Sequence, residues 1–193
     1  MRSIGVFGGT FDPPHLGHLI VAADVCIALE LDRLLFIPAA VPPHKLAQVQ
    51  ATAEQRLEMV RAAIRGDSRF EVDDLELRRP GPSFTVDTLR TLRTRFPESR
   101  LYFLIGADAL REIHSWREPE EVARLARLIV FARDGQPAPE MHGIAAQPVP
   151  VTRVDVSASE IRRRVRAGIP IRYLVPEAVR EIIERENLYQ QQF

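Results

Sequence analysis

The sequence predicts an α/β fold in which helices cover both faces of a doubly wound parallel sheet. Short apolar runs rich in Ile, Val, Leu and Phe alternate with longer segments of helical period, and this alternation is typical of parallel strands joined by crossover helices. With 193 residues, 46% of them hydrophobic, the chain can bury one sizeable core but is too short for two comfortable domains. We therefore expect one Rossmann-like domain over residues 1–189, followed by a frayed tail at 190–193.

The candidate strands are apolar runs bounded by turn residues. Five of them are clear: Ser3 to Phe7, Arg33 to Pro38, Phe70 to Leu77, Leu101 to Ile105, and Leu128 to Ala132. A weaker candidate, Val149 to Val154, comes late in the chain. Three prolines at 38–51, and four prolines with two glycines at 134–150, predict that both of these segments are loops.

The predicted helices are recognised by their period and by their first residues. Residues 17–29 are almost all apolar, which predicts a helix packed against the sheet on most of its sides. Thr52 and Gln55 form a capping-box pattern that opens a helix ending near Arg65. Further helices are predicted at Val86 to Arg95, at Ser157 to Ala167, and from Pro176, as the first helical residue, to about Glu186.

Charge and cysteine content narrow the class of protein. Lys plus Arg and Asp plus Glu both total 26, so no overall basic field is available to hold a nucleic acid backbone. The single cysteine, Cys26, has no internal disulfide partner and lies in an apolar helical run, which suits a core position in a reducing compartment. No apolar stretch is long enough to span a bilayer. We expect a cytoplasmic protein that binds neither nucleic acid nor membrane.

The first candidate site follows the opening strand. The stretch from Gly8 to His18 reads Gly-Gly-Thr-Phe-Asp-Pro-Pro-His-Leu-Gly-His, and it places a flexible turn and two imidazoles at the start of a helix. Free N–H groups and the helix dipole favour anions at such a position. The spacing fits neither the Gly-x-Gly-x-x-Gly dinucleotide fingerprint nor a Walker loop. A phosphate site of another type is therefore predicted.

His15 and His18 are three residues apart, so both can point into one pocket where the loop joins the helix. Helix capping, a zinc pair and phosphate contact are the alternatives. Zinc needs three or four ligands, and no Cys or His follows at finger spacing. We therefore favour phosphate contact over capping, and we expect no metal held by protein ligands.

This first stretch resembles the Gly-Gly-x-Phe-Asp-Pro-x-His-x-Gly-His signature of the nucleotidyltransferase superfamily, which is highly specific. The resemblance implies that His15 and His18 contact the ATP phosphates and stabilise the charge that develops on the α-phosphate. It also implies that the glycine between them lets adenine approach the backbone. The ATP-binding residues that it implies in this stretch are Gly8, Gly9, Thr10, Phe11 and Gly17.

A second candidate site, residues 156–162, reads Val-Ser-Ala-Ser-Glu-Ile-Arg and places two hydroxyls and an arginine at another helix start. Capping accounts for the serines, whereas an arginine fork suits phosphate geometry. The stretch resembles the Ile-Ser-Ser-Thr-x-Ile-Arg motif of the same superfamily. This implies that Ser157, Ser159 and Arg162 bind the β- and γ-phosphates, with Arg162 as a third catalytic residue. The stretch departs from the motif at Val156, Ala158 and Ser159, and Ala158 has no hydroxyl, so we assign its side chain no role.

Three segments in the middle of the chain resemble bacterial nicotinate-nucleotide adenylyltransferases. Residues 38–45 are similar to the family's Pro-x-x-x-Pro-Pro-His-Lys loop, and residues 83–89 to its Ser-Tyr-Thr-x-Asp-Thr-Leu, with Phe84 in place of Tyr. Gly106-Ala107-Asp108 matches a Gly-x-Asp turn after a strand. The resemblance implies that His44 and Lys45 meet the acceptor phosphate, and that Gly106 and Asp108 contact ATP through its ribose.

Nicotinate is a flat ring with a carboxylate, so its site needs a stacking face and a few short donors. Trp116, the one tryptophan, stands at the family's aromatic position, and the Thr85 hydroxyl is a donor. A partly buried core anchor is an equally weighted alternative for Trp116 without the family pattern. An N-cap is the alternative for Thr85, and it is compatible with ligand binding.

The resemblance covers residues 4–162 with the motifs in family order, and it implies a nicotinate-nucleotide adenylyltransferase. Such an enzyme transfers AMP from ATP to nicotinate mononucleotide and gives deamido-NAD and pyrophosphate in NAD biosynthesis. The acceptor phosphate is already ionised near neutral pH, so we expect direct in-line attack without a general base or a covalent intermediate. Mg²⁺ is expected to accompany ATP through phosphate oxygens and water.

Two alternatives stay open, one within the enzyme class and one outside it. Phosphopantetheine adenylyltransferases and cytidylyltransferases share the loop with His15 and His18 but lack the combination of Pro-Pro-His-Lys, Ser-x-Thr and Trp116. A non-catalytic nucleotide-binding regulator is favoured only by Ala158. The sequence is compatible with a homo-oligomer and does not specify the oligomeric state.

Overall fold

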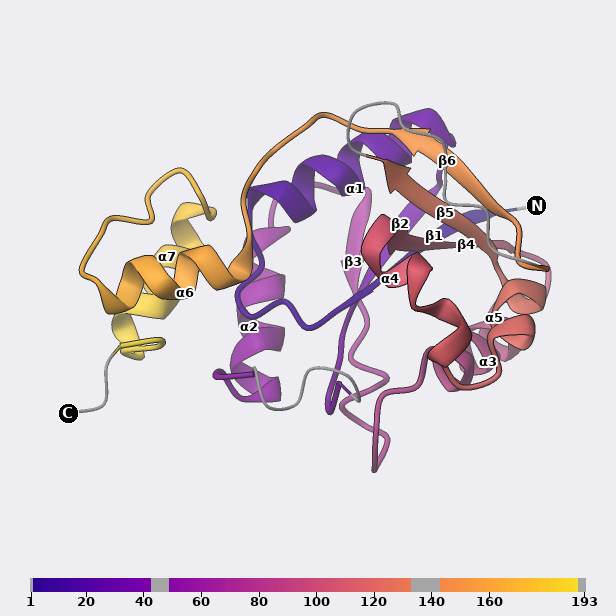
Figure 1. Ribbon diagram of the computed structural model, residues 1–193, viewed down its shortest axis with the longest axis horizontal. Helices are drawn as coiled ribbons and strands as arrows, with labels where there is room; N and C mark the ends of the chain where they lie inside the picture. The colour runs from indigo at the N-terminus through magenta and orange to yellow at the C-terminus, as the bar shows by residue number, and fades with distance from the viewer. Residues whose placement is uncertain (1, 43–48, 133–142, 191–193) are drawn as a thin grey trace.

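The computed structural model describes residues 2–42, 49–132 and 143–190. In this part of the chain, six parallel strands form one sheet in the order β3-β2-β1-β4-β5-β6, and helices flank it in a single α/β domain (Figure 1). The strands are β1 (Ser3–Gly9), β2 (Arg33–Pro38), β3 (Phe70–Val72), β4 (Arg100–Gly106), β5 (Arg127–Ala132) and β6 (Ala146–Pro150). The helices are α1 (Leu16–Ala28), α2 (Ala53–Ala63), α3 (Thr85–Arg95), α4 (Ala107–Arg111), the 3-10 helix η2 (Ile113–Ser115), α5 (Pro119–Leu125), α6 (Ala158–Arg166) and α7 (Glu177–Arg185).

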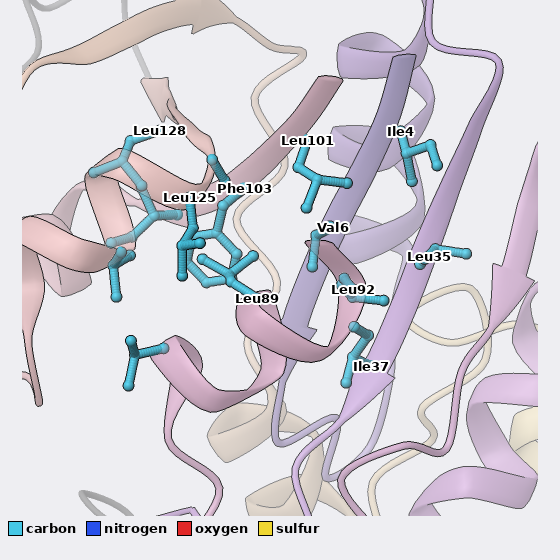
Figure 2. Packing of buried hydrophobic residues seen from close by; sticks show 14 of the residues in the cluster. Ile4, Val6, Leu35, Ile37, Leu89, Leu92, Leu101, Phe103, Leu125 and Leu128 are labelled. Atoms are coloured by element: carbon cyan, nitrogen blue, oxygen red, sulfur yellow. The ribbon is translucent and has the colours of Figure 1, made fainter. Parts of the chain in front are cut away.

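Side chains of the central strands alternate between two buried faces. Along β2, Leu34 and Phe36 pack with residues of α1, whereas Leu35 and Ile37 pack with residues of α3. Figure 2 shows this second face, where Leu89 and other leucines of the helices lie over the strands. Strands buried on both faces have nearly continuous hydrophobic sequences, which is why apolar runs predicted them.

A third cluster of buried residues lies beside the sheet and joins three helices. Met59 of α2, Ile161 of α6 and Val179 of α7 are fully buried in it. Val60 of α2 packs on the sheet, so α2 connects the sheet to the C-terminal helices at one end of the molecule (Figure 1). The start of α6 is thereby held in a defined position relative to the strands.

The strand order reverses beside β1. This strand pairs with β2 on one side and with β4 on the other, so the connections that follow β1 and β4 leave in opposite directions. In open parallel sheets, such a point leaves a crevice outside the carboxyl ends of the strands. Gly9 and Gly106 end the two strands, and both belong to segments predicted to bind ATP.

Two predicted helix starts are confirmed in atomic detail. Thr52 Oγ1 accepts a hydrogen bond from Gln55 N (3.2 Å), and Gln55 Oε1 accepts one from Thr52 N (2.8 Å), which is a capping box. At the start of α6, Ser157 Oγ accepts from Glu160 N (3.2 Å). The last helix begins one residue later than predicted, because Pro176 is its N-cap and not its first helical residue.

The predicted strand from Phe70 to Leu77 is too long. β3 ends at Val72, since the Asp73 carboxylate accepts a hydrogen bond from Leu75 N (3.1 Å) and bends the chain. A short acidic side chain that bonds to nearby backbone competes with the ladder of a sheet. Periodicity alone did not reveal this stop signal.

The sixth strand lies earlier in the chain than predicted. β6 occupies Ala146–Pro150, inside a segment predicted to be a loop and only partly overlapping the predicted strand at 149–154. Pro148 and Pro150 have no N–H to donate, and proline is tolerated on an edge strand. β6 is an edge strand of the sheet. Its prolines are therefore compatible with a strand, and the prediction of a loop gave them too much weight.

Two predictions about helices are corrected. α1 does not pack on most of its sides: only Gly17, Ala22, Val25 and Cys26 are buried, and Ile27 is 68% exposed.

The helices α4, η2 and α5 were not predicted, because none exceeds seven residues and such short segments show no clear helical period. No helix in the described ranges combines the length and the apolar character needed to cross a bilayer.

Candidate active site

A cavity of about 900 Å³ opens at the carboxyl ends of β1 and β4. The connection from β1 to α1, the end of β4 with α4, and the start of α6 line it. All residues predicted to be catalytic or to bind ATP are among the lining residues: His15, His18, Arg162, Gly8, Gly9, Thr10, Phe11, Gly17, Gly106, Asp108, Ser157 and Ser159. The two candidate sites, far apart in the sequence, therefore meet in one cavity.

The two imidazoles are held in a defined arrangement at the start of α1. The rings of His15 and His18 stack with centroids 3.7 Å apart, and the His18 ring makes edge contacts with Phe7 and Phe11. His15 N donates a hydrogen bond to Nδ1 of His18 (3.2 Å). A neutral imidazole that accepts at Nδ1 carries its proton on Nε2. In this arrangement Nδ1 of His18 caps the helix, and Nε2 is left to donate to a phosphate. Capping and phosphate contact, which were alternatives in the sequence, are therefore compatible for His18.

Two glycines allow rings to approach the backbone closely. A Cβ on Gly17 would lie 3.1 Å from Nδ1 of His15, and a Cβ on Gly9 would lie 2.9 Å from the Phe11 ring. Phe11 itself has a φ of +50°, in the left-handed region that residues other than glycine adopt uncommonly. The missing side chains thus let the chain fold back tightly and bring His15 and Phe11 to the cavity.

Arg162 reaches from α6 to the connection between β1 and α1. Its Nη1 donates to the carbonyl oxygen of Asp12 (2.7 Å) and lies 3.9 Å from the Oδ2 atom of the same residue. The side chain is 11% exposed, and its buried Nε has no hydrogen-bond partner within the described residues. The guanidinium therefore has donor capacity left for a phosphate group.

Asp12 is a buried residue to which sequence analysis assigned no role. Its carboxylate accepts hydrogen bonds from Gln50 N (2.8 Å), Ala51 N (3.2 Å) and the Tyr189 hydroxyl (2.7 Å). Burial, together with the charge of Asp12, raises the pKa of Tyr189 above its usual range, so this hydroxyl stays protonated and donates. The position of Asp12 in the N-terminal signature was a signal for its importance, whereas nothing in the sequence pointed to Tyr189.

The start of α6 forms one wall of the cavity. Ser157, Ala158 and Ser159 line it, and Ser157 is also the N-cap of this nine-residue helix. The first N–H groups of a helix have no intrahelical partner and favour anions. Ala158 has no hydroxyl, so only its backbone groups are available as donors at this wall.

The end of β4 forms another wall. Asp108 lies in the first turn of α4, where its side chain is 98% exposed and pairs with Arg111. Arg111 also lines the cavity, and sequence analysis missed it. The three-residue spacing of this pair is a helical signal, but it was visible only once α4 was known to be a helix.

The predicted acceptor residues are located only in part. Trp116 lines the cavity, and its ring makes an edge contact with Phe103 at 6.2 Å between centroids, so it is also a packing residue. Thr85 is not among the lining residues. It is the first residue of α3, and the N-cap is Phe84, so the alternative that Thr85 is an N-cap was wrong. His44 and Lys45 lie outside the described residues.

Comparison with known proteins defines the family. Residues 6–164 match the model of a family described as cytidylyltransferase-like. The chain is 49% identical over 186 residues to a probable nicotinate-nucleotide adenylyltransferase of Thermus thermophilus, across 96% of this chain and 98% of that protein. The chain belongs to the nicotinate-nucleotide adenylyltransferase family. This membership favours that activity over the phosphopantetheine adenylyltransferase and cytidylyltransferase alternatives.

The chain is also similar to a further family member and to a solved structure. The probable nicotinate-nucleotide adenylyltransferase of Shouchella clausii is 43% identical over 192 residues, across 98% of this chain and 97% of that protein. The fold is similar to that of Plasmodium falciparum nicotinic acid mononucleotide adenylyltransferase complexed with NaAD, with a TM-score of 0.81, 20% sequence identity and 98% of each chain covered. At this identity, the structural likeness supports the Rossmann-like fold.

Proposed function

We propose that this protein transfers AMP from ATP to nicotinate mononucleotide and produces deamido-NAD and pyrophosphate in NAD biosynthesis. The observation that carries the proposal is the single cavity lined by His15, His18 and Arg162. The histidines come from the start of α1 and the arginine from α6. One triphosphate in this cavity would therefore be held from two sides by elements that are distant in the sequence.

The reaction is a direct in-line displacement at the α-phosphorus of ATP. An oxygen of the acceptor phosphate forms a bond to this phosphorus, and the bond from the phosphorus to the oxygen bridging the α- and β-phosphates breaks. Pyrophosphate leaves with the electron pair of the broken bond. The attacking phosphate is already ionised near neutral pH, so the protein contributes positioning and charge stabilisation and needs no general base.

On the ATP side, His15 and His18 contact the phosphates and stabilise the charge that develops at the α-phosphate. The Nε2 proton of His18 is the donor, because Nδ1 accepts from backbone. Arg162 and the start of α6, with Ser157 and Ser159, hold the β- and γ-phosphates. The remaining ATP contacts that we propose come from Gly8, Gly9, Thr10, Phe11, Gly17, Gly106 and Asp108.

On the acceptor side, Trp116 supplies a face on which the pyridine ring stacks. Its contact with Phe103 holds the indole in place at the cavity. The Thr85 hydroxyl and neighbouring N–H groups at the start of α3 bind the ring substituent, and His44 and Lys45 bind the acceptor phosphate. A flat anionic ligand needs this combination of a stacking face and a few donors.

Mg²⁺ would accompany ATP as a complex with the nucleotide, because phosphate sites rarely use a full protein cage for this ion. Within residues 2–42, 49–132 and 143–190, no three side chains of His, Cys, Asp or Glu are grouped so as to hold a metal ion. The ion supplies neutralisation of the charge on the leaving pyrophosphate. The side chains of His15, His18 and Arg162 bind and orient the phosphates.

The proposal also covers the extent and the setting of the enzyme. We take residues 1–189 as the nucleotidyltransferase domain, because Leu188 and Tyr189 are still buried in the C-terminal cluster. A cytoplasmic setting suits the single cysteine, Cys26, which is buried and free. Sedimentation of the purified protein decides whether copies associate into a homo-oligomer.

An assay of pyrophosphate release tests the function. The purified protein is given ATP and, in parallel, nicotinate mononucleotide, nicotinamide mononucleotide or phosphopantetheine, and CTP replaces ATP in a further series. We expect the highest kcat/KM with ATP and nicotinate mononucleotide. A preference for phosphopantetheine or for CTP would overturn the proposal, and nucleotide binding without release from any acceptor would favour the non-catalytic regulator.

A further inference from the structure

Arg56 of α2 is an arginine in the interior of the protein. Its side chain is among the largest that are fully buried, and the residue is 1% exposed. Arginine is rarely buried to this degree unless a partner compensates its charge. Burial lowers the pKa of Arg56 from its usual value, and the charge of Asp12 counteracts this shift. Because burying a charged side chain costs free energy, packing alone does not explain why an arginine occupies this position.

The guanidinium of Arg56 donates to four backbone carbonyls. Its Nη1 donates to the carbonyl oxygens of Thr10 (2.8 Å) and Ala39 (2.6 Å). Its Nη2 donates to the carbonyl oxygen of Ala40 (3.1 Å), and its Nε to that of Ala51 (3.3 Å). One planar, rigid group with five donors therefore joins three separate chain segments.

Two of these segments lead to the two substrates. Thr10 lies directly after β1 and lines the cavity proposed for ATP. Ala39 and Ala40 directly follow β2 and begin the loop between β2 and α2 (residues 39–52), in which His44 and Lys45 are proposed to bind the acceptor phosphate. The fork of Arg56 thus spans from the ATP cavity to the described start of this acceptor loop.

We infer that Arg56 is a positioning residue that sets the distance between ATP and the acceptor. This inference rests on the proposed function. In-line attack requires the acceptor oxygen close to the α-phosphorus and in line with the leaving oxygen, and a misplacement of about 1 Å can cost on the order of 100-fold in rate. Arg56 touches neither substrate and acts through the backbone of Thr10, Ala39 and Ala40.

A second side chain holds the start of the acceptor loop without reaching the ATP cavity. Ser83 Oγ accepts hydrogen bonds from Ala40 N (2.9 Å) and Val41 N (3.3 Å), and Ser83 N donates to the carbonyl oxygen of Val41 (2.9 Å). Ser83 therefore holds only the start of the acceptor loop, whereas Arg56 holds this start relative to the chain at Thr10. This difference allows the two effects to be separated.

The test compares Arg56→Lys with Ser83→Ala and with a matched control, Arg93→Lys. Arg93 also donates its guanidinium to backbone carbonyls, those of Ser99 (2.7 Å) and Leu125, but it lines no part of the cavity. All variants are assayed where circular dichroism shows them folded. The kcat, both KM values, and the dissociation constant of each substrate alone, read from Trp116 fluorescence, are measured.

For Arg56→Lys we expect kcat to fall on the order of 100-fold, with much smaller changes in the affinity for either substrate alone. A single ammonium cannot reproduce a planar fork across three segments. Ser83→Ala should raise the KM for nicotinate mononucleotide by about fivefold, as for one lost hydrogen bond, and leave the KM for ATP and kcat close to wild type. Arg93→Lys should lower the thermal midpoint and leave kcat at the wild-type value.

Several results would overturn the inference. One such result is a wild-type kcat in Arg56→Lys. Another is a loss of activity in Arg56→Lys that is explained entirely by weaker binding of one substrate. If Arg56→Lys does not fold, Ser83→Ala provides the test, because Ser83 holds the loop start without contacting Thr10. A fall in the kcat of Ser83→Ala as large as the rise in its KM would show that the loop start alone controls the spacing, and that the link from Arg56 to Thr10 does not. A wild-type protein without pyrophosphate release would instead refute the proposed function, so the two failures are distinguishable.

Discussion

His18 serves the helix and the proposed reaction with one ring. Its Nδ1 accepts the N–H of His15, while Phe7 and Phe11 hold the ring at its edges.

Cys26 lies in the same helix, and burial raises the pKa of its thiol to about 11. The thiol therefore stays protonated at neutral pH, as expected for the core residue that the sequence predicted rather than for a reactive group.

The proposed role of His18 is tested by His18→Ala. We expect kcat to fall on the order of 100-fold or more, because one donor to the developing charge is lost. The KM for ATP should change far less, since Arg162 and the start of α6 remain. Steady-state kinetics check this, and a wild-type kcat in the variant would remove His18 from the mechanism.

Trp116 has two roles that one substitution can separate. It lines the cavity and also packs on Phe103. With Trp116→Ala, we expect the KM for nicotinate mononucleotide to rise by about tenfold, as for loss of an aromatic stacking partner, while the KM for ATP stays near wild type. Equal losses for both substrates would show that Trp116 is only structural.

At the scale of elements, the sequence located the long and regular ones. The central strands and α1, α2 and α3 were predicted close to their bounds, because burial on both faces of a sheet and helix caps leave local signals. The predictions failed where a local signal was absent or weak. β6 contains prolines that an edge position tolerates, and α4, η2 and α5 are too short for a period.

The segment after α7 connects to the N-terminal signature through one hydrogen bond, from the Tyr189 hydroxyl to Asp12. For Tyr189→Phe we expect a loss of about 2 kcal/mol in the free energy of unfolding, as for a hydrogen bond to a charged group, measured by urea denaturation. The kcat should fall less than in His18→Ala, because the turn keeps its other bonds. A variant as stable as wild type would contradict this connection.

The Tyr189 hydroxyl also makes the free energy of unfolding depend on pH. Tyr189 has a raised pKa in the folded state, with burial as the main cause, so above the ordinary tyrosine pKa of about 10 the unfolded chain loses its proton while the folded chain keeps it. The folded state then binds more protons, and stability falls as the pH rises through this range. Urea denaturation between neutral and alkaline pH should show a shallower fall for Tyr189→Phe than for wild type.

At the scale of the whole molecule, the cavity brings together two segments that are far apart in the sequence. Addition of ATP alone should slow amide hydrogen exchange in residues 8–18 and in residues 157–162 together, since both line one cavity. Mass spectrometry of the exchanged peptides checks this. Protection of one segment without the other would contradict a triphosphate held from both sides.

The sequence by itself determined the α/β class and most of the strands, and it indicated the candidate site segments, because apolar runs, caps and the two signature stretches are local patterns. Only the tertiary structure decided that these segments share a cavity, since a strand order that reverses beside β1 and a helix cluster around α2 bring them together. The roles of Arg56 and Tyr189, and the contacts of Asp12, became visible only there. Their partners are backbone groups and side chains distant in the sequence, and hydrogen bonds of that kind have no spacing that a linear pattern can reveal.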